Sequence, residues 1–152
     1  MIGVLKSTVT PSPKNILAVR ALNQLGKDGV SSCLFYAFLP PQFPITVETN
    51  MLQKAEAFNF NEIVIADELI LAQQLVNLVC AKKRYYYSYD LDWGRIDNFQ
   101  FKHLKSLFMN DSIELIARSD SHYKVLSALF KKPKYIMPNW NPDVLKEIDK
   151  DG

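Results

Sequence analysis

The chain has 152 residues, 48% of them hydrophobic and 22% charged, which is ordinary for a globular protein. Its 18 basic and 16 acidic residues leave a net charge of +2, so charge alone gives no case for a nucleic-acid or membrane partner. No apolar run approaches the ~20 residues that cross a bilayer, and the opening run stops at Lys6, too early for a signal peptide. We therefore expect one cytoplasmic domain. Cys33 and Cys80 lie in apolar segments, which predicts two free, buried thiols.

The chain opens with a strand, a loop and a helix. Residues 2–5 predict a short buried strand. Ser12 followed by Pro13 predicts a helix start, with a hydroxyl cap and proline at the first helical position. The helix should end at Gly26 or Gly29. The loop carries no Gly-x-Gly-x-x-Gly, so a dinucleotide-binding site is not predicted.

Two further apolar runs follow. Residues 32–38 predict a second strand, and Asn50 should cap a short helix. Residues 63–66 are apolar without alternation, which is typical of a strand covered on both faces of a parallel sheet. A deeply packed helix is then expected, beginning at residue 67 or 68 and ending at residue 79.

The second half of the chain repeats this alternation. Its periodicity and capping residues predict strands over 85–89, 113–117 and 135–137, with helices that begin at Asp97, after His122 and at Asn141. Strand and helix thus alternate about six times. The sequence therefore predicts an α/β fold: a doubly wound, Rossmann-like, mostly parallel sheet of about six strands with helices on both faces.

The strongest candidate for chemistry stands at the end of the aromatic strand over 85–89. Asp90 and Asp92 follow this strand, at the edge of a parallel sheet where ligands bind. Spaced two apart on an extended chain, they point the same way, so one can be a general base or both can hold a divalent metal. A three-residue pattern is too short to assign a metal site. Two polar loop residues at a strand end are at least as good an interpretation.

Several other side chains can face a ligand at the same edge. The hydroxyls of Thr8 and Thr10 follow the first strand, and Trp93 can stack on a sugar or a base. Ser119 stands at a strand-to-helix turn whose free amides can hold an anion. For the hydroxyls, plain capping and turn roles are the simpler interpretation. The basic clusters at residues 82–84 and 131–134 precede strands and should lie at the opposite edge of the sheet.

Short segments resemble the N-terminal, acceptor-side domain of GT-B-fold glycosyltransferases. Residues 112–119 look like a strand that runs into a turn and helix of that domain, and residues 134–141 look like the strand and Pro-Asn turn that leave it. Residues 85–90 are similar to a segment of phage DNA glucosyltransferases in which an aromatic strand ends in a catalytic aspartate. The resemblance implies sugar transfer from a nucleotide sugar without another cofactor. Asp90 would then be the catalytic base, and the substrate-binding residues would be Thr8, Thr10, Asp92, Trp93 and Ser119.

The resemblance also implies a missing half. GT-B enzymes bind the donor mainly through a second Rossmann-like domain, whose acidic ribose contacts and phosphate-binding helix have no counterpart here. We therefore expect a donor-binding domain or second chain as a partner, with the acceptor open and DNA among the candidates, and a homo-oligomer also left open. A non-catalytic protein-interaction module is the main alternative. A metal-dependent phosphoryl-transfer or receiver-like domain using Asp90 and Asp92 is weaker, because residues 6–8 bring no acid.

Overall fold

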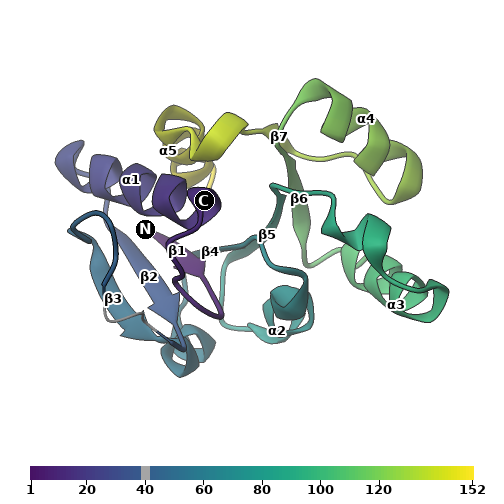
Figure 1. The fold of residues 1–152 in the computed structure, drawn as a ribbon, viewed down its shortest axis with the longest axis horizontal. Coiled ribbons are helices and arrows are strands. Elements are labelled where there is room, and N and C mark those ends of the chain that lie inside the picture. Colours follow the sequence, from purple (N-terminus) through teal and green to yellow (C-terminus); the bar gives the residue numbers. More distant parts are fainter. Residues whose placement is uncertain (39–41) are drawn as a thin grey trace.

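The computed structural model describes residues 1–38 and 42–152, whose strands form one seven-stranded parallel sheet (Figure 1). The strand order is β3-β2-β1-β4-β5-β6-β7. The strands are β1 (Ile2–Leu5), β2 (Ser32–Tyr36), β3 (Asn50–Gln53), β4 (Ile63–Ala66), β5 (Lys83–Ser88), β6 (Glu114–Ala117) and β7 (Tyr135–Ile136). Every neighbouring pair is parallel, which confirms the predicted doubly wound, Rossmann-like class.

Helices cover both faces of this sheet. Helices α1 (Pro13–Lys27) and α5 (Pro142–Lys150) lie together on one face (Figure 1). Helices α2 (Ala72–Asn77), α3 (Asn98–Phe108) and α4 (Asp120–Leu129) contribute to the core on the other face, with short 3-10 segments η1 (Lys54–Asn59), η2 (Leu69–Leu71) and η3 (Asp92–Arg95). A fourth 3-10 segment, η4 (Pro138–Trp140), joins β7 to α5.

Alternation along each strand feeds two separate cores. Tyr85 and Tyr87 of β5 point into the core under α1 and α5, whereas Tyr86 points into the opposite core. The Tyr87 hydroxyl donates to the carbonyl oxygen of Met137 at 2.5 Å, and the Tyr86 ring packs against Phe108 with 4.5 Å between centroids. The aromatic run is thus a fully buried interior strand, as its lack of a polar face predicted.

Three of the predicted helix starts are confirmed. The side chains of Ser12, Asp97 and Asn141 each accept a hydrogen bond from a backbone amide in the first turn of α1, α3 and α5. For Asp97 the donor is the Gln100 amide, at 2.8 Å. Each cap satisfies a backbone N–H group that has no partner within the helix.

The prediction of a helix capped by Asn50 is wrong. Asn50 opens β3, which pairs with β2 in the register Cys33↔Asn50, and the short 3-10 segment η1 follows. The sheet therefore has seven strands rather than about six. Pairing with β2 supplies backbone hydrogen bonds that the four-residue segment could not gain as an isolated turn of helix.

Two smaller expectations also need correction. The helix predicted from residue 67 or 68 to residue 79 is only η2 and α2, because Asp67 and Glu68 are extended or tied to the loop after β1. Cys33 is buried as predicted, but Cys80 is exposed, since α2 ends at Asn77 and leaves the following turn at the surface.

Among the described helices, none is both long and apolar enough to cross a membrane.

Candidate functional site at the carboxyl edge of the sheet

The centre of the carboxyl edge is occupied by a buried ion pair. Strands β1 and β4 are neighbours whose connections leave toward opposite sides, and doubly wound folds commonly bind ligands at such a switch point. Lys6 directly follows β1 and Asp67 directly follows β4. The Lys6 Nζ atom lies 2.7 and 2.6 Å from the two carboxylate oxygens of Asp67, and the two side chains are 1% and 0% exposed. The switch point between β1 and β4 is therefore occupied by a buried ion pair.

The groups around this pair act on the pKa of Lys6 and hold the neighbouring loops together. Burial lowers the pKa of the Lys6 ammonium, and the Asp67 carboxylate opposes that shift. The Nζ atom also lies 5.3 Å from the centre of the Trp140 ring. Beside the pair, the Ser7 amide donates to Glu68 Oε1 at 3.1 Å and the Ser7 hydroxyl donates to Glu68 Oε2. These contacts fix the loops after β1 and β4 to each other.

Asp90 stands at the next position along the edge, just after β5. Its side chain is 45% exposed, and its Oδ2 atom lies 3.9 Å from Nζ of Lys14 in the first turn of α1. Lys14 also donates to the backbone oxygen of Asp67 at 3.4 Å, and the Ser88 hydroxyl donates to the backbone oxygen of Asp90 at 3.1 Å. Asp90 is thus a solvent-reaching carboxylate whose position is held by neighbouring residues, so a ligand can approach it.

A shallow hollow opens in front of Asp90. Its volume is about 340 Å³, and it is lined by Asp90, Leu91, Asp92 and Arg95. Asp92 is exposed and begins η3, so the two carboxylates share one hollow. Among the described residues, no group of three or more His, Cys, Asp or Glu side chains is arranged to hold a metal ion.

A second hollow lies at the carboxyl ends of β6 and β7. Its volume is about 380 Å³, and it is lined by Arg118, Ser119, His122, Pro138 and Asn139; we call it the Arg118 hollow. The Arg118 guanidinium donates from Nε and Nη2 to Asn139 Oδ1, at 3.3 and 2.9 Å. Ser119 caps α4 by accepting from the His122 amide, which is the simpler of the two roles considered for it.

Three consecutive residues at the end of β5 connect the two hollows. The Ser88 carbonyl faces His122 Nδ1 at 3.3 Å, the Tyr89 ring lies under the Arg118 guanidinium at 4.1 Å, and Asp90 lines the neighbouring hollow. Two residues of chain span at most about 7 Å. The two hollows are therefore bordered by neighbouring residues of one short segment of backbone.

The threonines of the first loop are placed less favourably. The Asn15 side-chain amide donates to the backbone oxygens of Thr8 and Thr10 and to the Thr10 hydroxyl, at 3.4, 3.0 and 3.3 Å. Thr10 is exposed and Thr8 is half-buried. Both threonines lie at the carboxyl edge, but their hydrogen bonds with Asn15 hold the loop that leads into α1.

Trp93 does not present a ring face to a ligand in this structure. The side chain is 6% exposed and packs against Phe130 and Phe101, with centroids 5.3 and 6.4 Å apart. The ring fills the core beside α3 because η3 turns it inward. The expectation of a stacking role for Trp93 is thus at odds with its position.

Five residues of this edge were not predicted as site residues: Lys6, Asp67, Arg118, His122 and Asn139. A usable signal existed for the first three, because each is the charged residue immediately after a buried apolar strand. In a parallel sheet, that position always falls at the carboxyl edge. For His122 and Asn139 we find no comparable signal, since their approach depends on how α4 and η4 pack.

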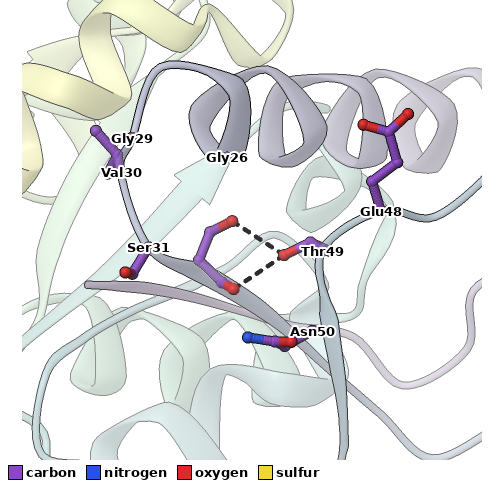
Figure 2. Close-up of a pocket in the computed structure, with 8 residues that line it drawn as sticks. Gly26, Gly29, Val30, Ser31, Glu48, Thr49 and Asn50 are labelled. Atoms are coloured by element: carbon purple, nitrogen blue, oxygen red, sulfur yellow. Dashed lines mark hydrogen bonds between the residues drawn. The ribbon is translucent and has the colours of Figure 1, made fainter.

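A further polar hollow of about 260 Å³ lies at the opposite edge, near the amino ends of β2 and β3 (Figure 2). Thr49 Oγ1 donates to the backbone oxygen of Ser32 at 3.0 Å, and the two hydroxyls lie 2.9 Å apart. The Glu48 side chain points away from Thr49 and Asn50 in Figure 2; it is exposed and pairs with Lys27 at 3.5 Å. The polar groups of Ser32, Thr49 and Glu48 already have protein partners, so the carboxyl edge is the better candidate for a functional site.

Comparison with known proteins does not decide among functions. No family model matches the sequence. No curated protein and no solved structure matches it at a significant level. The function has to be inferred from the geometry of the carboxyl edge, together with the short segments that resemble glycosyltransferases.

Proposed function

We propose that this chain is the acceptor-side half of a glycosyltransferase, in which Asp90 is the general base. The observation that carries the proposal is the position of the Asp90 carboxylate: 45% exposed, at the carboxyl edge of a doubly wound sheet, and in front of an open hollow. A general base must reach the proton that it removes and must be held in place. The exposure of Asp90 lets it reach an acceptor hydroxyl, and its contacts with Ser88 and Lys14 hold it in place.

The proposed reaction is the transfer of a sugar to an acceptor hydroxyl. An acceptor hydroxyl attacks the anomeric carbon of a nucleotide sugar while the bond to the nucleoside diphosphate breaks. The hydroxyl proton passes to Asp90. The Lys14 Nζ atom, at 3.9 Å from Asp90 Oδ2, helps to hold the carboxylate in place. The donor is supplied by a donor-binding domain or a second chain, and DNA stays among the candidate acceptors.

The test is sugar transfer by the complete protein or assembly in which this chain works. Release of nucleoside diphosphate is measured with a panel of nucleotide sugars, for the unmodified protein and for Asp90→Asn. We expect Asp90→Asn to lower turnover by about 10²–10⁴-fold, because that is the usual contribution of a general base. The isolated chain should bind no nucleotide sugar with micromolar affinity by calorimetry.

Asp92→Asn is the matched control, since it removes a carboxylate from the same hollow. Its loss should be smaller. Equal losses together with dependence on added divalent metal would instead favour the metal-dependent reaction. Unchanged turnover in Asp90→Asn, or no transfer from any donor by the complete assembly, contradicts the proposal.

A second candidate is a non-catalytic protein-interaction module. It is favoured by an apolar groove of about 370 Å³ between η2 and α3, where Ile70 and Phe99 are 77% and 82% exposed. Large apolar side chains that stay exposed together are a common mark of protein contact sites. This candidate predicts partner binding without any sugar transfer, so the same assay separates the two.

A further inference from the structure

We infer that the Arg118 hollow binds a phosphate-class oxyanion on the acceptor molecule, while Asp90 faces the acceptor's hydroxyl. That the bound molecule is a sugar acceptor rests on the proposed function, whereas the evidence for an anion site is separate. The hollow, at about 380 Å³, falls within the size range of small-molecule sites, and none of its five lining residues is acidic. Asp120 follows Ser119 but is exposed and does not line the hollow.

Arg118 supplies the positive charge. A guanidinium has five N–H groups, and two of them are used on Asn139 Oδ1, so three are left. Within the described part of the chain, no ion pair includes Arg118. A planar guanidinium with adjacent free N–H groups matches the oxygens of a phosphate in a bidentate manner.

The guanidinium is also held in one orientation. The Tyr89 ring stacks on one of its faces at 4.1 Å, and Asn139 fixes one edge. Asn139 and Trp140 both have left-handed backbone conformations, with φ of 50° and 58°. Trp140 is 1% exposed and packs edge-on against Tyr87, so its burial holds the turn in this shape. A guanidinium fixed in advance loses less side-chain entropy when an anion binds.

His122 lies on the other side of the hollow. Its Nδ1 atom is 3.3 Å from the Ser88 carbonyl, which can only accept, so Nδ1 carries a hydrogen. Within residues 1–38 and 42–152 no side chain or backbone group bonds to Nε2, so this atom can meet a ligand. As a neutral ring it accepts from a hydroxyl of phosphate, and as an imidazolium it donates to an oxyanion. The positive end of the ten-residue helix α4 adds a smaller contribution in the same direction.

The substrate class follows from the spacing. Ser88 and Tyr89 position the two sides of the Arg118 hollow, and Asp90 is the next residue along the chain. A compact phosphorylated sugar or alcohol can therefore place its phosphate between Arg118 and His122 and one hydroxyl beside Asp90. The oxyanion fixes the acceptor's orientation and takes no part in bond making.

The experiment is a titration of the isotope-labelled full chain with inorganic phosphate, followed by NMR at constant ionic strength. We expect saturable shifts of the His122 ring and of amides around Ser119. Charge-assisted hydrogen bonds of this kind correspond to about a 10- to 100-fold change in affinity, so Arg118→Gln should weaken phosphate binding by that factor. Arg20→Gln removes an exposed arginine from α1 and should change nothing.

His122→Gln provides a second variant, which should weaken binding even if Arg118→Gln proves to be misfolded by its spectrum. The inference is overturned if phosphate shifts no resonance at the hollow, or if Arg20→Gln weakens binding as much as Arg118→Gln. No sugar donor is present, so failure here leaves the transferase assay unaffected. Conversely, phosphate binding without any sugar transfer would overturn the proposed function and leave the anion site standing.

Discussion

Lys6 and Asp67 place two opposite charges at the carboxyl edge in positions that are almost completely buried. Removing both groups from water costs free energy, which their mutual attraction and hydrogen bonds must offset. The pair therefore adds little net stability over an apolar replacement, although each partner depends strongly on the other. Its position at the point where β1 and β4 diverge indicates a role in holding the two loops, and thereby Lys14 and Asp90, in register.

We expect Lys6→Met to lower the free energy of unfolding by about 3–5 kcal/mol, because it leaves the Asp67 carboxylate buried without a partner. The double variant Lys6→Met/Asp67→Leu should recover most of that loss, since no uncompensated charge remains. Urea unfolding followed by circular dichroism measures both. If the double variant loses as much as the single one, the charges themselves stabilise the fold and this view of the pair is wrong.

Single residues also show where sequence reasoning reaches its limit. Asp90 could be placed at the carboxyl edge because its location depends only on the end of a recognisable strand. Trp93, three residues later, was expected to face a ligand but lies in the core. Its direction is decided by the turn of η3 and by the neighbouring rings of Phe101 and Phe130, which are brought there by distant segments.

Elements were predictable where their determinants are local. The caps at Ser12, Asp97 and Asn141 are short-range hydrogen bonds, so the sequence was enough to locate three helix starts. Strand β3 has no local signature, because its four residues become a strand only by pairing with β2. Its side chains are half-buried or exposed, so it carries no continuous apolar run.

The packing of the central strand β1 can be tested at Gly3, with Gly26 of helix α1 for comparison. The same substitution to alanine should change the stability of the fold in opposite directions at the two positions. A Cβ atom on Gly3 would lie 2.6 Å from the Phe35 ring and 3.0 Å from the Phe60 ring, which pack edge-to-face at 5.1 Å. We expect Gly3→Ala to destabilise the fold by about 1–3 kcal/mol through overpacking. Gly26 lies in α1 with nothing within 4 Å of the added carbon, so Gly26→Ala should stabilise by up to about 1 kcal/mol.

Urea unfolding of both variants provides the measurement. Gly26→Ala is the matched control, because it changes the same atoms in the unfolded chain. An unchanged stability in Gly3→Ala would mean that the Phe35 ring yields easily to the added carbon, and an equal loss in Gly26→Ala would mean that the loss does not come from the packing of β1.

At the scale of the whole molecule, one sheet separates two apolar cores. Alternating strands and helices predicted the doubly wound class, because a parallel strand needs a crossover to its neighbour. The strand order and the seventh strand could not be predicted, since they depend on pairings between segments far apart in the chain. The contacts of the candidate site could not be predicted for the same reason. Arg118 and Asn139 are 21 residues apart in the sequence, and Ser88 and His122 are 34 residues apart.

The two tryptophans report on the two cores separately, which makes the unity of the domain testable. Trp93 belongs to the core beside α2 and α3, and Trp140 to the core beneath α1 and α5. Strand β5 contributes to both, through Tyr86 on one face and Tyr85 on the other. Loss of either core would expose one face of every central strand. We therefore expect the two cores to unfold together.

With excitation at a wavelength that tyrosine does not absorb, the fluorescence of Trp93→Phe comes from Trp140 alone, and that of Trp140→Phe from Trp93 alone. For each variant, the urea midpoint from fluorescence should coincide with that from far-ultraviolet circular dichroism, as two-state unfolding requires. The comparison is made within each variant, because the two substitutions change stability by different amounts. Separate midpoints in either variant would mean that one face can unfold without the other, and the chain would then contain two cooperative units.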